Sequence, residues 1–444
     1  MRVTIMPGGL AGSVSAIPSK SHLHRLLIHA ALADKETLIT CANTDAEDIN
    51  ATIDCLSALG ASVERCEDGF AVKPCNFAPL RLCESSSQVT LPCMESGSTL
   101  RFMLPVVCAL GVRAVFQMKG RLPERPMAPL ETQLENHGIR LWREKPDLLY
   151  CEGKLTPGEY HLPGDISSQY ITGLLMALPL LDGPSRLTVA EPVESADYIA
   201  MTLEVAEAFG HKPEINQNHY DIQGMGVFTS PGRIAAEGDW SNGAFWLCAG
   251  AMPGGDIELR GLKKDSRQGD RVICDILAQM GASVKWDGGI LRITEGGRHG
   301  TEIDIRAIPD LGPVLAAVAA AGTGTTVIRN AARLRLKESD RLFSTAQTLN
   351  ALGADLRETE GSGSSASGSN TSGSSTSLIV NGRPRLTGGE VDSFGDHRIA
   401  MMAAIASAAC TQAVTISGAE AVNKSYPAFW KDFAALGKVL KAEV

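Results

Sequence analysis

Hydrophobic and polar positions follow a pattern that recurs along the chain. Apolar residues at helical spacing run into a glycine and then into a short alternating segment, which predicts an amphipathic helix followed by a strand. A glycine at such a helix end adopts the left-handed backbone that other residues rarely tolerate. The five clearest of these glycines are 71 to 78 residues apart. They are Gly60, Gly138, Gly210, Gly281 and Gly353, and Gly437 ends a weaker sixth copy.

A second series of helical segments is apolar on all sides, which predicts buried helices. These segments are "HRLLIHAALA", "LRFMLPVVCALG", "YITGLLMALPLL", "AFWLCAGAM", "VLAAVAAAG" and "RIAMMAAIASAAC". Together the two series predict a unit of strand, buried helix, strand, amphipathic helix and strand pair, repeated six times. Six units are too many for a single core, so we expect an α/β chain with two similar domains of three units each.

Composition and charge exclude several classes of function. The chain has 444 residues and a formal net charge of −9, which argues against nucleic-acid binding because phosphate backbones attract basic surfaces. No long uncharged apolar run and no signal-peptide pattern occurs, so we expect a cytoplasmic protein that does not enter a membrane. The eleven cysteines lack metal-binding spacing, which predicts reduced thiols, no disulfides and no zinc.

Residues 361–377 differ from the rest of the chain in composition. The segment "GSGSSASGSNTSGSSTS" cannot contribute to a core and is typical of a flexible linker, whether natural or engineered. It also lengthens the last interval of the glycine repeat, which would otherwise match the others. We therefore expect a poorly ordered surface loop without a catalytic role.

Basic residues lie at the starts of several predicted buried helices. Lys20, Arg25, Arg101 and Arg398 occupy such positions, where the helix dipole disfavours a cation. Free N–H groups combined with Lys or Arg at a helix start bind phosphate or carboxylate groups. The sequence therefore predicts local anion sites in an acidic protein. The stretch "LRLKESDRLFST" places two acids between two further cations, which by itself would suggest only exposed ion pairs worth under about 1 kcal/mol.

Nine segments of the chain carry a family resemblance. They are "PSKSHLHR", "ESGSTLRF", "GRLPERPMAPL", "GDISSQY", "ESADY", "IPDLGP", "RLKESDRL", "GDHRIAM" and "NKSYPAF". In order and spacing the chain resembles 5-enolpyruvylshikimate-3-phosphate synthases over essentially its whole length, and "LKESDRL" with a downstream "DHRIAM" is the most specific pair. The resemblance implies two inverse α/β domains, each of three βαβαββ units. It assigns residues 1–18 and 237–444 to one domain and 19–236 to the other.

The resemblance also implies a reaction. The enolpyruvyl group of phosphoenolpyruvate would move to the 5-hydroxyl of shikimate 3-phosphate, with release of phosphate. Protonation at C3 allows the hydroxyl to attack C2, and a tetrahedral intermediate then loses phosphate and a methyl proton. This chemistry needs a base, an acid and cations around the anionic groups. It implies two small-molecule substrates, no cofactor and no metal, and we expect a monomer.

Individual residues receive roles from the same resemblance. Asp310 corresponds to the base on the 5-hydroxyl, Glu338 to the group that exchanges a proton with C3, and Lys20 to a contact of both substrates and a further proton-transfer candidate. The residues implied for shikimate 3-phosphate are Lys20, Ser21, Arg25, Ser167, Ser168, Gln169, Ser195, Tyr198, Asp310 and Lys337. The residues implied for phosphoenolpyruvate are Lys20, Gly97, Arg125, Gln169, Arg341, Arg398 and Lys424.

Some positions stay open. Asp340 is expected either to pair with an arginine or to cap a helix, and Arg101, Arg121 and Arg335 either touch substrate or form ion pairs. Glu95 and Arg333 stand where the family often has Asn, so their contacts are undecided. Because the assigned residues fall on both predicted domains, we expect shikimate 3-phosphate to draw two cation-rich faces together.

Two alternative functions can be weighed against this one. UDP-N-acetylglucosamine enolpyruvyl transferases usually have a reactive Cys in the loop that reads "GRLPERPMAP" here, and this loop contains no Cys. A non-catalytic scaffold for polyanions is the second alternative. Asp310 and Glu338 argue against it, because acidic groups among anion-binding cations would weaken a pure binder.

Overall fold

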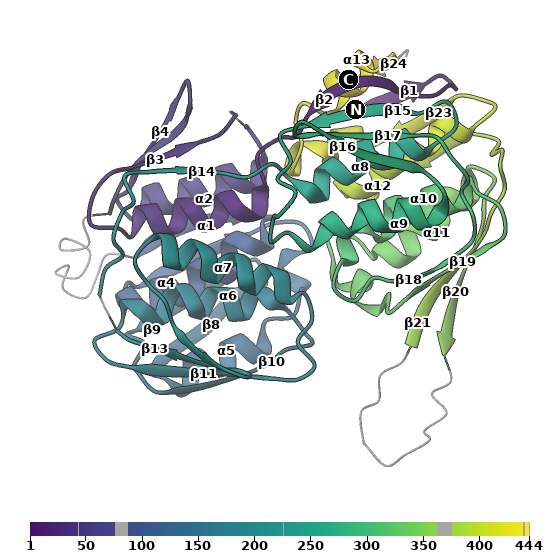
Figure 1. Ribbon diagram of the computed structural model, residues 1–444. Coiled ribbons are helices and arrows are strands. Elements are labelled where there is room, and N and C mark those ends of the chain that lie inside the picture. Colours follow the sequence, from purple (N-terminus) through teal and green to yellow (C-terminus); the bar gives the residue numbers. More distant parts are fainter. Residues whose placement is uncertain (43, 76–87, 225, 362–374, 438–439, 444) are drawn as a thin grey trace. The chain divides into compact units, whose positions relative to one another are not determined.

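The computed structural model describes residues 1–42, 44–75, 88–224, 226–361, 375–437 and 440–443 (Figure 1). They form two units. Unit 1 is Met1–Ile17 with Gly238–Val444, and unit 2 is Pro18–Glu237. The chain passes between the units twice, each time one residue from a predicted domain boundary.

Unit 2 contains three sheets and two series of helices. Its helices are α1 (Lys20–Ala31), α2 (Glu47–Ala58), α4 (Gly97–Leu110), α5 (Ala128–Asn136), α6 (Ser168–Ala177) and α7 (Ala196–Ala208), with the short η1 (Leu122–Glu124) and η2 (Leu178–Leu180). Its strands are β3 (Thr37–Thr40), β4 (Ser62–Cys66), β5 (Gly69–Lys73), β6 (Val89–Met94), β7 (Ala114–Met118), β8 (Ile139–Lys145), β9 (Leu148–Gly153), β10 (Glu159–Pro163), β11 (Ser185–Ala190), β12 (Glu214–Asn216), β13 (His219–Ile222) and β14 (Arg233–Ala235).

Unit 1 repeats this architecture. Its helices are α8 (Trp240–Ala251), α9 (Ile273–Met280), α10 (Gly312–Ala320), α11 (Arg341–Ala351), α12 (His397–Ala406) and α13 (Phe429–Ala435), with η3 (Gly269–Val272), η4 (Pro309–Leu311), η5 (Ala332–Leu336), η6 (Ser407–Ala409) and η7 (Ala419–Lys424). Its strands are β1 (Arg2–Ile5), β2 (Ala11–Ser15), β15 (Asp256–Arg260), β16 (Ser283–Asp287), β17 (Ile290–Thr294), β18 (Glu302–Asp304), β19 (Thr325–Arg329), β20 (Asp355–Gly361), β21 (Ser375–Asn381), β22 (Gly389–Asp392), β23 (Val414–Ser417) and β24 (Leu440–Glu443).

All six four-stranded sheets share one pairing pattern. In the sheet β6-β7-β9-β8, for example, β6 is parallel to β7, whereas β9 is antiparallel to both β7 and β8. A parallel pair needs a long crossover, which a buried helix supplies, and an antiparallel pair needs only a short turn. The predicted repeat of strand, buried helix, strand, amphipathic helix and strand pair is therefore confirmed, as is the α/β class.

Two edge strands depart from the order of the chain. β2 precedes α1 in sequence but pairs with β15 in unit 1, and β14 precedes α8 but pairs with β3 in unit 2. β1 and β24, from opposite ends of the chain, are neighbours in one sheet. Each unit is thus completed by a strand from a distant part of the sequence, which explains why the chain passes between the units twice.

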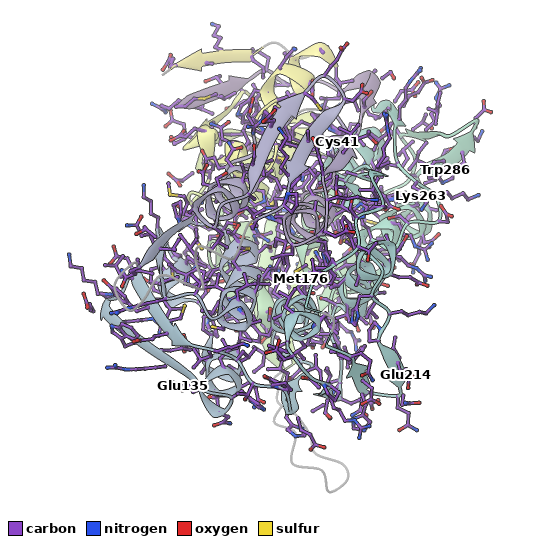
Figure 2. The ribbon with its side chains drawn as sticks, turned by 90° about the vertical axis from the view of Figure 1, so that its left-hand side faces the viewer. Cys41, Glu135, Met176, Glu214, Lys263 and Trp286 are labelled. Atoms are coloured by element: carbon purple, nitrogen blue, oxygen red, sulfur yellow. The ribbon has the colours of Figure 1, made fainter. Side chains whose placement is uncertain are left out.

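Each unit has its own hydrophobic core, centred on three buried helices. These are α1, α4 and α6 in unit 2, and α8, α10 and α12 in unit 1. Figure 2 shows Met176 of α6 inside unit 2, where it is fully buried, whereas Glu135 and Glu214 lie at the surface of that unit. Five of these helices, α1, α4, α6, α10 and α12, begin within segments that carry the family resemblance, so the core itself fixes the positions of those segments.

The predicted loop at 361–377 is shorter than expected. β20 and β21 pair in register from Asp355 opposite Asn381 to Gly361 opposite Ser375, so residues 361 and 375–377 belong to strands. The prediction was wrong at these ends because backbone pairing does not depend on side chains, and Ser and Gly can continue a ladder. Residues 362–374 lie outside the described residues.

The sequence predicted no membrane segment, reduced thiols and no metal site. No helix among the described residues is long and apolar enough to cross a membrane. Every cysteine in that part of the chain is a free thiol, and no group of three His, Cys, Asp or Glu side chains there could hold a metal ion.

Candidate active site

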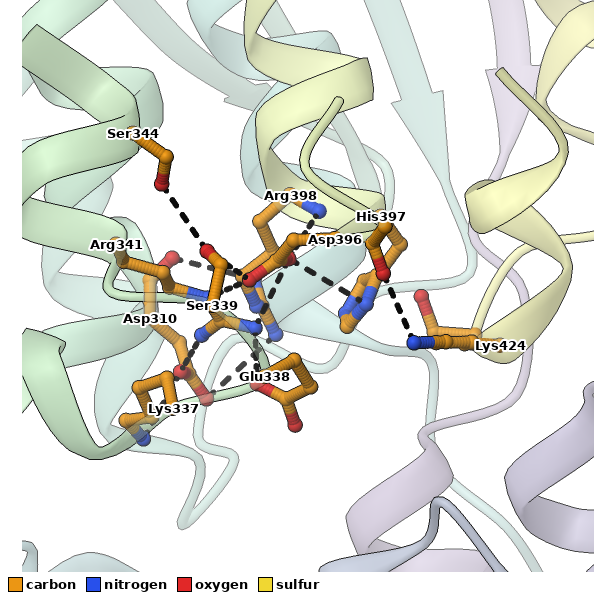
Figure 3. A network of polar contacts seen from close by, with 12 residues as sticks. Asp310, Lys337, Glu338, Ser339, Arg341, Ser344, Asp396, His397, Arg398 and Lys424 are labelled. Carbon is orange, nitrogen blue, oxygen red and sulfur yellow. Dashed lines mark hydrogen bonds and ion pairs between the residues drawn. The ribbon is translucent and has the colours of Figure 1, made fainter. Parts of the chain in front are cut away.

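Asp310 and Glu338 of unit 1 meet at one guanidinium group, that of Arg341 at the start of α11 (Figure 3). Its Nη1 donates to Asp310 Oδ1 at 2.7 Å and its Nη2 donates to Glu338 Oε2 at 2.5 Å. Its Nε donates to Asp396 Oδ2 at 2.7 Å. The Arg341 side chain is only 1% exposed, so three carboxylates surround a buried cation.

Asp310 also contacts two other cations. Lys337 Nζ lies 3.1 Å from its Oδ1, and Arg398 Nη2 lies 3.6 Å from its Oδ2. Arg398 further donates from Nη1 to the backbone oxygen of Asp310 and from Nη2 to Ser241 Oγ, at 3.2 and 2.8 Å. Asp310, Lys337, Glu338, Arg341, Asp396 and Arg398 are named below as the unit 1 cluster. The cluster has three positive and three negative groups.

Burial and these charges compete over the protonation of the cluster. Burial by itself would raise the pKa of Asp310, but Arg398, Lys337 and Arg341 together hold that pKa well below its usual range. Burial lowers the pKa of Lys337 to about 8, although Asp310 acts in the opposite direction. For Asp396 the effect of burial is again outweighed, here by Arg341, and its pKa is lowered. Both aspartates are therefore ionised at neutral pH.

Asp396 was not predicted as a site residue. It is fully buried, caps α12 by accepting from Arg398 N at 2.9 Å, and binds Arg341 through both of its oxygens. Ser339 Oγ donates to it at 3.0 Å. An aspartate before a helix is an ordinary cap in sequence, so only its three-dimensional partners reveal its contact with Arg341.

Asp340, Arg335 and Arg333, whose contacts the sequence left open, have defined partners in the structure. Asp340 does both things that were considered: it caps α11 by accepting from Phe343 N at 3.1 Å, and it accepts from Arg335 at 3.0 Å. Arg335 also pairs with Glu358 at 2.5 Å, and Arg333 Nη1 donates to the Arg306 backbone at 3.3 Å. Lys424, at the end of η7, donates to the Gly395 backbone oxygen at 2.8 Å.

In unit 2, the predicted residues lie at the starts of α1, α4, α6 and α7. The guanidinium of Arg125 lies directly against Gly97, the first residue of α4, so closely that a Cβ at position 97 would stand 2.7 Å from Arg125 Nη1. Ser98 then accepts from Gln169 Nε2 at 2.9 Å. The structure therefore groups Gly97, Arg125 and Gln169, three residues that the resemblance assigns to phosphoenolpyruvate.

Arg101 is a buried residue that hydrogen-bonds to a member of this group. It is 4% exposed and donates to Gln169 Oε1 at 2.6 Å and to the Pro126 backbone oxygen at 3.0 Å. These contacts orient Gln169, a role that neither option considered for Arg101, substrate contact or ion pairing, had included. Arg121, in contrast, is exposed and lies 3.6 Å from Glu124.

Arg25 is the most deeply buried cation of unit 2, at 2% exposure. It donates to the backbone oxygens of Ser21 and Tyr198, at 2.7 and 3.0 Å, and to Thr172 and Thr202, at 3.2 and 2.8 Å. No described carboxylate forms an ion pair with it. Burial lowers its pKa to about 10, which still leaves it cationic at neutral pH.

The remaining predicted residues of unit 2 surround Arg25 or begin neighbouring helices. Lys20 Nζ forms an ion pair of 2.6 Å with Asp48 of α2. Asp48 was not singled out in the sequence, because an acidic residue in the first turn of a helix is ordinary. Ser167 caps α6, and Ser168 is its first residue. Ser195 begins α7 in a left-handed conformation (φ 55°), which is uncommon for a residue with a side chain.

Comparison with known proteins gives one consistent result. A family profile described as "EPSP synthase (3-phosphoshikimate 1-carboxyvinyltransferase)" matches residues 6–433. Two relatives with the name 3-phosphoshikimate 1-carboxyvinyltransferase come from Clostridium novyi and Clostridium beijerinckii. They are 38% and 41% identical, over 99% and 98% of this chain and 98% and 97% of their own. A solved EPSP synthase from Acinetobacter baumannii is 25% identical, with a TM-score of 0.75 over 99% of this chain and all of its own.

Proposed function

The chain belongs to the EPSP synthase family, and from this premise we propose how its two groups of residues share the family's reaction. The protein is a transferase of the shikimate pathway. It moves the enolpyruvyl group of phosphoenolpyruvate to the 5-hydroxyl of shikimate 3-phosphate and releases phosphate. The reaction proceeds by addition and elimination through a tetrahedral intermediate.

The unit 1 cluster supplies the proton transfers. Asp310 accepts the proton of the 5-hydroxyl, and Glu338 delivers a proton to C3 and later removes one. The single observation that supports this assignment best is that one guanidinium, that of Arg341, donates to both carboxylates. Shared donors on a rigid, planar group fix two carboxylates at a constant separation. An acid and a base that act on different atoms of one intermediate need such a fixed separation.

Binding of substrate strengthens Asp310 as a base. In the protein alone, Lys337, Arg341 and Arg398 lower its pKa and so weaken its attraction for a proton. The same three cations are assigned to substrate anions, whose negative charge offsets theirs. The pKa of Asp310 then rises toward the range useful in catalysis. The acidic limb of kcat, which reports the bound enzyme, should therefore lie at higher pH than the acidic limb of kcat/KM.

Arg341 serves a double purpose in this scheme. Its Nε, Nη1 and Nη2 already donate to three carboxylates, and the side chain is 1% exposed. With the hydrogen-bond donors on Nε and Nη2 fully used and one on Nη1 left over, it must exchange one of these partners to bind the carboxylate of phosphoenolpyruvate through two hydrogen bonds. Glu338 is the partner that exchanges. The carboxylate of phosphoenolpyruvate then accepts the hydrogen bond from Arg341 that Glu338 accepted, and the Glu338 side chain turns toward C3.

Unit 2 supplies most of the binding charge. Lys20, Arg25, Arg101 and Arg125 carry four positive charges, of which Asp48 offsets one. Shikimate 3-phosphate takes Ser21, Arg25, Ser167, Ser168, Ser195 and Tyr198, phosphoenolpyruvate takes Gly97 and Arg125, and Lys20 and Gln169 serve both. Arg25 supports the assignment because a buried cation without a described ion pair is stabilised by an anionic ligand.

The expected mechanism of closure changes in one respect. The sequence suggested two cation-rich faces that repel each other, but in unit 1 the four assigned cations Lys337, Arg341, Arg398 and Lys424 are largely offset by the three carboxylates of the unit 1 cluster. Repulsion between such faces is therefore weak. We propose instead that shikimate 3-phosphate binds first to the more positive unit 2 and completes its contacts with Asp310 and Lys337, which brings the units to a closed state through differential binding.

A two-substrate assay of phosphate release tests the proposal. Asp310→Asn and Glu338→Gln should each lower kcat roughly 100-fold or more, the usual scale for a general acid or base. Asp340→Asn is the matched control, because it changes another acid of the same stretch, keeps the cap of α11, and lies outside the cluster. Near-normal rates for both cluster variants would refute the roles. Binding of both substrates without phosphate release would favour the scaffold alternative. The monomeric state and the cytoplasmic location stay predictions.

A further inference from the structure

A chain of buried hydroxyl groups runs beneath the start of α4. It begins at His24 of α1, whose Nδ1 lies 2.7 Å from Thr52 Oγ1 of α2. Thr52 Oγ1 lies 2.7 Å from Thr99 Oγ1 of α4, and Thr99 Oγ1 donates to Ser96 Oγ at 2.7 Å. Ser96 is the cap of α4 and also accepts from Thr99 N at 3.3 Å. His24, Thr52 and Thr99 are fully buried, and Ser96 is 1% exposed.

The hydrogen bonds in this chain of hydroxyl groups have one donor-to-acceptor direction. Thr99 has a single hydroxyl proton, and the short bond to Ser96 uses it, with the backbone oxygen of Asp48 as a more distant acceptor at 3.4 Å. Thr52 must then donate to Thr99. The proton of Thr52 is thereby used, so His24 Nδ1 must donate to Thr52.

This donor-to-acceptor direction fixes which ring nitrogen of His24 carries the proton. Its Nδ1 carries the proton, and its Nε2, which has no described partner, is left as a bare acceptor. A buried N–H without an acceptor would be more costly than an unused lone pair. Burial, together with Lys20 and Arg25, lowers the pKa of His24 well below its ordinary value, so the ring is neutral.

Each helix that the chain connects also carries a residue of the substrate site. α1 provides Lys20 and Arg25, α2 provides Asp48, the partner of Lys20, and α4 begins with Gly97. The last acceptor, Ser96, is the residue directly before Gly97. The chain therefore sets how the Lys20–Asp48 pair lies relative to the start of α4.

We propose that His24 is a positioning residue for the phosphoenolpyruvate site at the start of α4, acting through Thr52, Thr99 and Ser96. The proposal rests on the function proposed above, since it concerns the same site. His24 does not touch the substrate in this scheme. It provides the first donor of the chain, without which Thr52 can reverse and the Ser96 cap loses its fixed orientation.

Histidine variants separate this role from a merely structural one. In His24→Asn the amide nitrogen can replace the Nδ1–H donor, whereas His24→Leu removes it and keeps an apolar body against Phe102. His29→Leu is the matched control. His29 lies in the same helix, is equally buried, and also has an unpaired Nε2, but its Nδ1 contacts only the backbone oxygen of Arg25.

The expected result is a selective change in KM. His24→Leu should raise KM for phosphoenolpyruvate roughly tenfold, the equivalent of one hydrogen-bonded contact, with kcat within about threefold. His24→Asn should stay within about threefold of the unmodified protein, and His29→Leu should leave KM unchanged even where it lowers the melting temperature. Thr52→Val should act like His24→Leu, and the double variant should add nothing further, because both interrupt one chain.

A measurement without catalysis completes the test. In ¹⁵N-labelled protein, the ring nitrogens of His24, assigned by their loss in His24→Asn, should show the neutral form protonated at Nδ1. A proton on Nε2 would overturn the proposal. So would equal effects of His24→Leu and His29→Leu on KM, or a failure of His24→Asn to restore it. If the unmodified protein releases no phosphate, the proposed function fails, and the NMR result still decides the direction of the chain.

Discussion

A methyl group added at Gly97 would test the contact on which the phosphoenolpyruvate site depends. The Cβ of Gly97→Ala would stand 2.7, 3.1 and 3.4 Å from Nη1, Cζ and Nη2 of Arg125. Contacts below 3.0 Å do not persist, so one group must move. The guanidinium is the free end of a flexible side chain, whereas position 97 belongs to a buried helix. Arg125 will therefore move.

The size of the effect follows from that movement. Restoring an ordinary contact of 3.4 to 4 Å requires the Arg125 guanidinium to shift by about 1 Å. A hydrogen bond to a charged group contributes ~1.5–3 kcal/mol, and a shift of this size loses much of it. We expect kcat/KM for phosphoenolpyruvate to fall roughly 10- to 100-fold. Stability should change in the opposite direction, since alanine is favoured over glycine in a helix by up to about 1 kcal/mol.

Steady-state assays with each substrate varied, together with thermal unfolding, measure both effects. KM for phosphoenolpyruvate should rise, and KM for shikimate 3-phosphate should stay unchanged. The melting temperature should stay unchanged or increase. A double-mutant cycle with Arg125→Ala gives the sharpest control, because removal of the guanidinium removes the three nearest neighbours of the added methyl group, which should then have little further effect. Additive effects of the two substitutions, or a loss of stability that parallels the loss of activity, would refute the reasoning.

Four further predictions concern charge, metal, the hairpin and closure. KM for shikimate 3-phosphate should rise as pH increases through about 8, because Lys337 is cationic below its pKa of about 8 and neutral above it. In Lys337→Arg the side chain stays cationic, so a pH series should show a flatter rise of KM. Phosphate release should be unchanged by EDTA, and a loss restored by a divalent ion would reveal an unrecognised metal site. Replacing 362–374 with a four-residue Gly/Asn turn should change activity little, since loop closure depends weakly on length; a severe loss in the same assay would assign the segment a function. Shikimate 3-phosphate alone should lower the radius of gyration in small-angle scattering, and an unchanged radius with equally tight phosphoenolpyruvate binding in its absence would contradict ordered closure.

Much of the fold could be read from the sequence because it depends on local rules. Gly281 ends α9 with φ 106° and Gly353 follows α11 with φ 93°, so only glycine fits these turns easily, and their spacing reveals the repeat. The apolar character of α10 on all sides predicted its burial. The ends of the Gly/Ser segment were less predictable, because the pairing of Gly361 with Ser375 depends on a partner strand rather than on composition.

The sequence by itself determined the repeat, the helix caps and, through its motifs, the family and the list of candidate residues. Caps and helix ends depend on residues a few positions apart, so their signals are local. Only the tertiary structure decided which charges meet. Asp310, Arg341 and Asp396 are separated by 31 and 55 residues, yet they share one buried network, and Arg125 reaches Gly97 from another loop. Such contacts arise because separate elements pack around a common core, and electrostatic and steric interactions depend on distance in space, which the order of residues does not specify.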